Sequence, residues 1–375
     1  MGKCLITKLN GSVQNDSLLR IGEFGVKVST VESPTADSQK FSVRNTKDSQ
    51  LRIIGDGYFT NETLSENKGK VMDIAANTET LVYYSNGDYE IVVSEKYSLS
   101  YIGISLSTNW KAFKGKLSFD IESLKYSPNI TIIYLFNTQV TGDIFVLGKL
   151  TGLTKADLSN TQVTGDISVL GKLTGLTGIY LSNTQVTGDI SVLGKLTGLT
   201  DIYLSNTQVT GDISVLGKLT GLTGIYLSNT QVTGDISVLG KLTGLRDIPD
   251  ISYTKVTGDI SVYRNTKVTQ IRLVGTSVSG DLSVLPNNVL WVQVRNTGMF
   301  TWTGIKNRTN ILALEQCKCD KIDAFLNDMA TLEAKFAGEQ SWYKTISLIG
   351  TRTSASDAAV QTLQSKGYTV SITPA

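Results

Sequence analysis

Residues 160–182 read NTQVTGDISVLGKLTGLTGIYLS, and near-identical copies of this stretch begin at Asn183 and Asn206. The copies recur with a period of 23 residues and keep Leu, Ile or Val at the same places. A single copy cannot bury its own apolar side, so neighbouring copies must stack to form a continuous core. The sequence therefore predicts a solenoid of stacked coils.

One position of each coil follows an apolar-x-apolar-x-x frame and is held by threonine in most coils. Successive residues at this position are 23, 23, 23, 23, 24, 22, 21, 20 and 34 residues apart. We expect these side chains to point inward and to bond backbone groups at a tight corner, because buried polar groups need partners. This structural ladder comprises Thr138, Thr161, Thr184, Thr207, Thr230, Thr254, Thr276, Thr297, Cys317 and Thr351. The frame is that of leucine-rich repeats, so the predicted fold is an α/β leucine-rich-repeat solenoid.

A Thr-Gly-Asp triplet follows the ladder position, as in Thr187–Asp189. The glycine permits a bend, and the aspartate is placed to cap a short helix or 3₁₀ turn over residues 190–196. Stacked carboxylates suggest calcium, but each coil offers only one carboxylate, so capping is the favoured role and no metal is expected. The aspartate column is Asp143, Asp166, Asp189, Asp212, Asp235, Asp259 and Asp281.

Residues 1–105 lack the period and indicate a small all-β N-terminal attachment domain. The expected strands are residues 4–9, 18–28, 40–43, 51–54, 70–74, 80–84 and 89–93. The Asn86-Gly87 turn predicts that the last two of these strands form a hairpin. The expected core of this domain contains Tyr83, Tyr84, Tyr89, Tyr97 and Tyr101.

The solenoid is expected over residues 106–315, with a divergent first coil at 115–136. Residues 316–375 are expected to form an α/β C-terminal cap with a helical insertion and a capping coil, because a bare terminal coil would expose its core. Apolar spacing predicts a helix over 320–336, capped by Asp320. It also predicts a second helix over 354–366, followed by Gly367 and a strand over 368–373.

The composition excludes several functions. The chain has no histidine among its 375 residues, which removes Ser-His-Asp machinery and His-ligated zinc, and we expect no enzyme and no cofactor. Lys+Arg total 35 against Asp+Glu 33, so neither nucleic acid nor an anionic membrane is an expected partner. No signal peptide or transmembrane segment is recognisable. Cys317 and Cys319 are too few and too closely spaced for a metal site, and burial is expected for them.

The strands of the coils are expected to present outward residues on a concave face. Tyr180, Tyr203 and Tyr226 form a ladder there beside small residues, which suits stacking and hydrogen bonding to a sugar or a protein loop. The alternative is that tyrosine at this place only favours β structure and packs ring on ring. The candidate ligand-binding residues are Tyr134, Asp157, Tyr180, Asp201, Tyr203, Tyr226, Arg272, Trp291 and Arg295.

Residues 115–315 resemble leucine-rich-repeat proteins, and the L-x-L-S-N-T-x-V-T-G-D-I form is similar to repeats in surface and phage proteins of gut Bacteroidales. Residues 3–23 (KCLITKLNGSVQNDSLLRIGE) and 345–372 (TISLIGTRTSASDAAVQTLQSKGYTVSI) resemble segments of virion proteins of phages that infect those bacteria, including the crAss-like group.

That resemblance implies a virion fibre or decoration protein assembled in the bacterial cytoplasm. Residues 1–105 would dock on capsid or tail proteins, and the repeats would bind a host-surface glycan or protein. A homotrimer is an expectation for fibres in general, although no heptad segment supports it here. Two alternatives stay open: a bacterial cell-surface adhesin and an intracellular protein-interaction scaffold.

Overall fold

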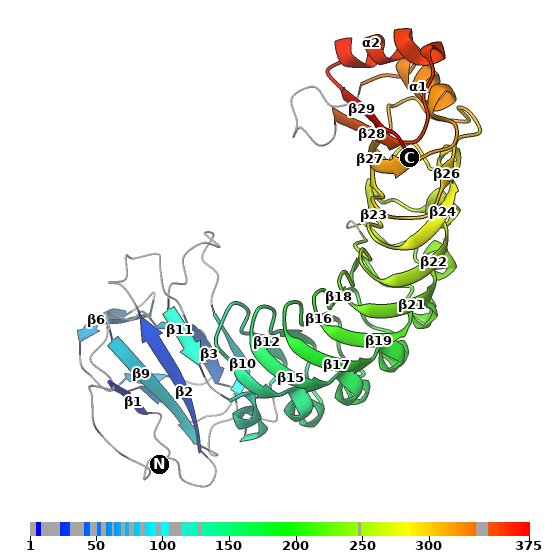
Figure 1. Cartoon of the computed structure of the whole chain (residues 1–375). Helices are drawn as coiled ribbons and strands as arrows, with labels where there is room; N and C mark the ends of the chain where they lie inside the picture. The colour runs from blue at the N-terminus through cyan, green and yellow to red at the C-terminus, as the bar shows by residue number, and fades with distance from the viewer. Residues whose placement is uncertain are drawn as a thin grey trace. The chain divides into compact units, whose positions relative to one another are not determined.

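The computed structural model describes residues 120–126, 130–246, 249–334 and 344–375. Before residue 119 it describes only the strands, and of these only the backbone. Contacts within the chain divide it into two compact units, residues 1–188 and 189–375. Each unit contains stacked coils, drawn in cyan to green for the first and green to yellow for the second (Figure 1).

The first unit begins with short strands that form mainly antiparallel sheets. One sheet has the order β1-β9-β2-β11, and β4 pairs with β7. A further set pairs β10 with β3, β3 with β8, β8 with β5, and β5 with β6. The bounds are β1 (Leu5–Lys8), β2 (Glu23–Thr30), β3 (Phe41–Asn45), β4 (Leu51–Ile53), β5 (Tyr58–Asn61), β6 (Leu64–Lys68), β7 (Met72–Ile74), β8 (Glu79–Val82), β9 (Gly87–Ser94), β10 (Leu99–Ile104) and β11 (Gly115–Ser118).

The hairpin predicted around Asn86-Gly87 is wrong. Strand β8 pairs with β3 and β5, whereas both edges of β9 are taken by β1 and β2. All eight residues of β9 pair with the eight of β2, a longer ladder than the four-residue β8 could provide. The tyrosines expected in the core of this region lie outside the residues whose side chains are described. Strands β5, β6, β10 and β11 were not predicted.

Strand β10 connects the N-terminal strands to the coils. It pairs with β3 in antiparallel fashion and with β12, the first short strand of the coils, in parallel fashion, with Tyr101 opposite Ile132. The expected first coil at residues 115–136 therefore begins later, because residues 115–118 form β11 and pair with β2. Its 3₁₀ turn, η1 (Ile121–Tyr126), follows Asp120, whose carboxylate accepts a hydrogen bond from Glu122 N.

Each coil of the first unit consists of a short strand, a tight corner, a second strand and a 3₁₀ turn. The short strands β12, β14 and β16 pair in parallel, as do the second strands β13, β15 and β17. The second parallel sheet was not predicted. A short helix or 3₁₀ turn was predicted after each aspartate, and the structure has a 3₁₀ turn there in every copy. The bounds are β12 (Ile132–Tyr134), β13 (Thr141–Asp143), η2 (Ile144–Lys149), β14 (Lys155–Asp157), β15 (Gln162–Asp166), η3 (Ile167–Lys172), β16 (Gly178–Tyr180) and β17 (Gln185–Asp189).

The second unit repeats this coil. Its short strands pair in parallel as β18-β20 and β23-β25-β27-β28-β29, and Asp250 forms single bridges to Tyr226 and Arg272. The bounds are η4 (Ile190–Lys195), β18 (Asp201–Tyr203), β19 (Gln208–Asp212), η5 (Ile213–Lys218), β20 (Gly224–Tyr226), β21 (Gln231–Asp235), η6 (Ile236–Lys241), β22 (Lys255–Asp259), η7 (Ile260–Asn265), β23 (Gln270–Arg272), β24 (Ser277–Asp281), η8 (Leu282–Val284), β25 (Trp291–Gln293), β26 (Phe300–Thr301), β27 (Ala313–Lys318), β28 (Thr345–Ile349) and β29 (Thr369–Thr373).

The core is the stack of aliphatic side chains that the period predicts. In one coil Leu196, Leu199, Ile202, Leu204 and Val209 are all completely buried, and the same positions are buried in the neighbouring coils. Complete burial of one such side chain contributes roughly 1.5–3 kcal/mol, so the stacking of coils is the main source of stability.

The C-terminal cap contains α1 (Ile322–Ala330) and α2 (Asp357–Ser365), the latter preceded by the 3₁₀ turn η10 (Ser354–Ser356). Asp320 is not the cap of α1, because the helix begins after Lys321 and Asp320 N donates to Phe300 O instead. The predicted apolar side of α1 is buried, with the ring of Phe325 edge-on to Trp302 at 5.2 Å, while Phe336 lies outside the described residues. Gly367 follows α2 with φ +85°, as its predicted position requires.

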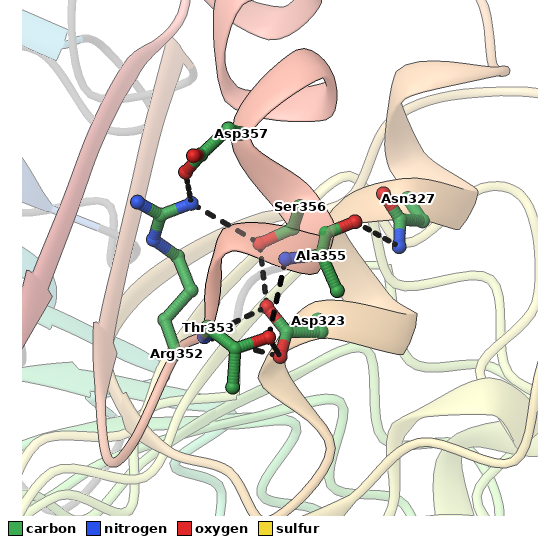
Figure 2. A network of polar contacts seen from close by, with 7 residues as sticks. All are labelled: Asp323, Asn327, Arg352, Thr353, Ala355, Ser356 and Asp357. Carbon is green, nitrogen blue, oxygen red and sulfur yellow. Dashed lines mark hydrogen bonds and ion pairs between the residues drawn. The ribbon is translucent and has the colours of Figure 1, made fainter.

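A polar network joins the two helices of the cap (Figure 2). The Asp323 carboxylate accepts hydrogen bonds from Ser356 Oγ at 2.6 Å and from Thr353 Oγ1 at 2.7 Å. Arg352 donates to Asp357 Oδ1 at 2.6 Å, and Asn327 donates to Ala355 O at 3.2 Å. The hydrogen bond from Ser356 is the main cause that lowers the pKa of Asp323. Ser356 is completely buried, so its hydrogen bond to Asp323 fastens η10 to α1 in the interior of the cap.

Candidate binding surface

The ladder threonines lie at the corner that follows each short strand. From Thr138 to Thr297 they are between 1% and 8% exposed. Each hydroxyl donates to the carbonyl three residues earlier, as Thr207 Oγ1 does to Leu204 O at 2.6 Å and Thr254 Oγ1 does to Ile251 O at 2.6 Å. The hydroxyl thereby satisfies a backbone oxygen that would otherwise be buried at the turn.

The residue before each ladder position has a positive φ. Asn is found there in most coils with φ of 53–57°, because Asn tolerates the left-handed conformation better than other non-glycine residues. The constant Asn of the Ser-Asn-Thr triplet was the available signal, and it was missed. The positive-φ residues at this position are Asn137, Asn160, Asn183, Asn206, Asn229, Tyr253, Gly275, Asn296 and Gln316.

The last two members of the expected ladder differ from the others. Cys317 follows Gln316 at φ 52° and is completely buried, and burial raises the pKa of its thiol well above the usual range. Cys319 is also buried and free, as expected. Thr351 is exposed, because it lies beyond β28, which ends at Ile349, and does not enter the core. It therefore lies outside the buried ladder.

The aspartate column caps the 3₁₀ turns, as predicted. In each of these coils Oδ1 accepts the backbone N–H two residues later at 2.7–2.9 Å, and in Asp212 this bond lowers the pKa. From Asp143 to Asp259 each carboxylate also lies against the glycine of the following coil, so that a Cβ built on Gly211 would stand 2.5 Å from Asp189 Oδ1. Among the described residues no three His, Cys, Asp or Glu side chains gather as a metal site would need.

We call the outward side of the short strands the short-strand face. In the first unit it carries Tyr134, Asp157 and Tyr180, which face one another in register and are half-buried. Burial raises the pKa of Asp157, while its hydrogen bond from Ser159 N at 3.0 Å acts in the opposite direction. The Tyr180 ring covers Gly178, where an added Cβ would meet Cε2 at 2.8 Å. Because Gly178 has no side chain, the Tyr180 ring can pack over it.

In the second unit one residue from each successive strand forms a single row across the short-strand face. Backbone pairing places these residues opposite one another in sequence order, and all are half-buried. We call them the central row: Tyr203, Tyr226, Asp250, Arg272, Gln293 and Glu315. The rings of Tyr203 and Tyr226 are stacked, with centroids 4.3 Å apart and planes 23° from parallel.

The other candidate residues lie beside this row. Asp201 accepts hydrogen bonds from the hydroxyls of Thr200 at 2.7 Å and Thr223 at 3.3 Å. Trp291 is only 4% exposed and lies under the Arg272 guanidinium, 5.5 Å from its ring centroid, so it supports the surface and is not part of it. Arg295 is exposed and lies two residues beyond the end of β25.

A pocket of about 200 Å³ opens beside the charged end of the central row. Its walls include Asp250, Tyr253, Arg272, Arg295 and Glu315. Tyr253 and Glu315 were not among the sequence candidates. The signal that could have found them is the departure of these coils from the repeated unit, since Tyr-Leu-Ser-Asn of the copies becomes Asp-Ile-Ser-Tyr at 250–253.

No protein-family model matches the chain, and no curated protein matches it. Solved structures do match. An internalin (inlF) of Listeria monocytogenes aligns with a TM-score of 0.50 and 18% identity over 76% of this chain and 85% of that one. The plant peptide hormone receptor RGFR1, solved in complex with RGF2, aligns with a TM-score of 0.48 and 21% identity over 64% of this chain, which spans 40% of the receptor's length.

The likeness to the internalin, together with the repeated parallel strands and 3₁₀ turns, shows a leucine-rich-repeat solenoid fold. No finding from these comparisons links the chain to phage virion proteins. Within the described part of the chain, no helix is both long and apolar enough to span a membrane.

Proposed function

We propose that the chain is a non-enzymatic binding protein that holds a segment of a partner protein on the short-strand face of residues 189–375. The central row carries this proposal, because it sets an aromatic end, Tyr203 and Tyr226, next to a charged end that continues to Glu315. Such a row combines apolar contact area with charges of both signs in one line.

The stacked tyrosines suit the centre of an interface. Tyrosine supplies a large rigid surface with few rotatable bonds and a hydroxyl that bonds at the rim. The stack also orders the two rings before a partner binds, which reduces the conformational entropy lost on binding. Cross-strand packing and ligand binding are thus two consequences of one arrangement.

The length of the row matches an extended peptide. Adjacent strands lie about 4.8 Å apart, so six residues in register extend over about 24 Å, the span of about seven residues of extended chain. The charged end favours a protein over a neutral glycan, because a peptide can place charged groups opposite Asp250, Arg272 or Glu315, whereas a neutral glycan has none.

Selection from a peptide-display library tests this function. We expect peptides selected on the full chain to lose at least tenfold in affinity for the double variant Tyr203→Ser/Tyr226→Ser. The matched control, Lys218→Ser/Lys241→Ser, alters exposed residues at the 3₁₀ turns η5 and η6, which follow Tyr203 and Tyr226 in the chain, and should bind as the parent does. An equal loss of peptide affinity in both double variants would overturn the proposal. Binding of the chain to glycans on an array, with no peptide selected, would overturn it as well.

Three settings fit a binding protein of this kind: a virion fibre or decoration protein docked through residues 1–105 on capsid or tail proteins, a cell-surface adhesin, and an intracellular scaffold. The virion setting is supported by the resemblance of residues 3–23 and 345–372. Mass spectrometry of purified particles and of host fractions separates the three. Presence of the chain in particles supports the virion setting, and its restriction to the cell envelope or cytoplasm contradicts it.

A further inference from the structure

We infer that the pocket beside Arg272 and Arg295 receives a carboxylate of the bound segment, with Tyr253 packed against the apolar group next to it. The inference rests on the proposed function and gives the ligand its chemistry. It identifies the partner segment as one that carries an aromatic or aliphatic residue for the tyrosines and an acidic group for the arginines.

Arg272, one of the side chains that line the pocket, has an unused hydrogen-bond donor. Arg272 Nε is buried and has no hydrogen-bond partner, and among the described residues neither Arg272 nor Arg295 forms an ion pair. A buried donor without a partner costs about 1–3 kcal/mol, and a shift of the side chain that brings Nε–H to a bound acceptor would recover this cost. The planar guanidinium presents paired N–H groups that match the two oxygens of a carboxylate.

The two acids of the pocket each accept a hydrogen bond from a neighbouring residue and offset the charge of the arginines. Asp250 Oδ1 accepts from Ser252 N at 3.1 Å, and Glu315 Oε1 accepts from Gln293 Nε2 at 3.1 Å. In formal charge they balance the two arginines, so the pocket has no excess positive charge that would favour a multiply charged anion such as phosphate. The geometry of the guanidinium donors, and not the net charge of the pocket, therefore favours a carboxylate.

The backbone conformation and the exposure of Tyr253 are unusual, and both support a binding role for the pocket. It has φ +55° and is 54% exposed, at the corner position where other coils carry Asn. A left-handed conformation costs a bulky residue about 1–2 kcal/mol, and strain of this kind gathers at functional sites. The next coil has Gly275 at the equivalent position, and an added Cβ there would meet Tyr253 Cδ1 at 2.8 Å, so the ring lies over this glycine at the pocket wall.

The strands that line the pocket are also those that depart from the repeat. The copies read Tyr-Leu-Ser-Asn, while the next coils read Asp-Ile-Ser-Tyr at 250–253, Arg-Leu-Val-Gly at 272–275 and Gln-Val-Arg-Asn at 293–296. Near-identical copies can offer only one repeated surface. A pocket with its own chemistry requires coils whose sequences differ. The pocket lies at the coils that differ from the repeated unit.

The test is a nuclear magnetic resonance titration of the full chain with N-acetyl-Tyr-Glu-amide, and with N-acetyl-Tyr-Gln-amide as the uncharged match. We expect the Arg272 Nε–H and Trp291 indole signals to shift with the Glu probe and its affinity to exceed that of the Gln probe at least fivefold. N-acetyl-Gly-Tyr with a free carboxylate shows whether the chain terminus is preferred to an acidic side chain. Equal affinity for the Glu and Gln probes would overturn the inference.

Arginine variants locate the effect. Arg295→Gln changes an exposed side chain and should reduce the preference for Glu without unfolding the protein. Arg272→Lys keeps the charge but removes Nε–H and should do the same. The control Arg264→Gln, on the 3₁₀ turn η7, should change nothing. If Tyr203→Ser/Tyr226→Ser loses display-selected peptides while both arginine variants keep them and keep the preference for Glu, the proposed function stands and the carboxylate assignment fails.

Discussion

The substitution Gly211→Ala tests how the coils are held in register. Gly211 has φ +111°, where an L-residue is strained by about 1–2 kcal/mol. Its new Cβ would stand 2.5 Å from Asp189 Oδ1, so the carboxylate must move. Asp189 then loses its hydrogen bond from Ser191 N, at 2.7 Å, and a lost N-cap costs about 0.5–2 kcal/mol. We expect the free energy of unfolding to fall by about 2–4 kcal/mol.

Urea unfolding followed by circular dichroism measures this loss. With a slope of about 1–3 kcal/mol per M, the midpoint should fall by about 0.7–4 M. Gly221→Ala is the matched control, because its Cβ would meet no atom closer than Leu199 O at 3.7 Å and its φ is not positive. That variant should be neutral or slightly more stable.

The double variant Asp189→Ala/Gly211→Ala separates the two causes. Removing the carboxylate relieves the close contact, and the cap is lost only once, so the double loss should be smaller than the sum of the single losses by about 0.5–2 kcal/mol. Additive losses, or a Gly211→Ala loss no larger than that of Gly221→Ala, would refute the proposed contact between successive coils.

Three further outcomes follow from the same structure. Thr207→Val removes the buried hydrogen bond to Leu204 O and should cost about 1–2 kcal/mol in urea unfolding, whereas the exposed Thr220→Val should cost little. Asp323→Asn should destabilise the chain at neutral pH. Because the folded-state pKa of Asp323 is lowered, the difference should be complete above about pH 4 and vanish as the pH falls through that lowered value; a pH-independent difference would contradict the network. Cys317, buried and with a raised pKa, should react with iodoacetamide far more slowly than a small thiol, and fast alkylation of the native chain would disprove its burial.

The sequence predicted what depends on the spacing of side chains. The Leu, Ile and Val period located the core, and the constant Asp before each Ile-Ser-Val segment identified the caps of the 3₁₀ turns. These features depend on residues within one coil and repeat in each coil, so their spacing can be recognised in the sequence.

The remaining features depend on contacts between distant residues. The Asn86-Gly87 dipeptide has the chemistry of a hairpin turn, but pairing of β9 with β1 and β2 overrides it. The pocket was missed for a similar reason. Tyr253 and Glu315 lie more than 60 residues apart, and only stacking of the coils brings both to its walls. Trp291 was assigned to the surface from strand alternation, but the Arg272 side chain covers it.

Hydroxyl-radical footprinting of the full chain tests most directly whether the short-strand face binds. The chain is oxidised alone and with a saturating display-selected peptide, and the modification of each side chain is read by mass spectrometry. We predict that the peptide protects Tyr203, Tyr226 and Tyr253 several-fold. Phe145, which is 55% exposed on the 3₁₀ turn η2, should stay unchanged as an internal control. Unprotected tyrosines at saturation, or protection confined to the 3₁₀ turns, would contradict the assignment of binding to this face.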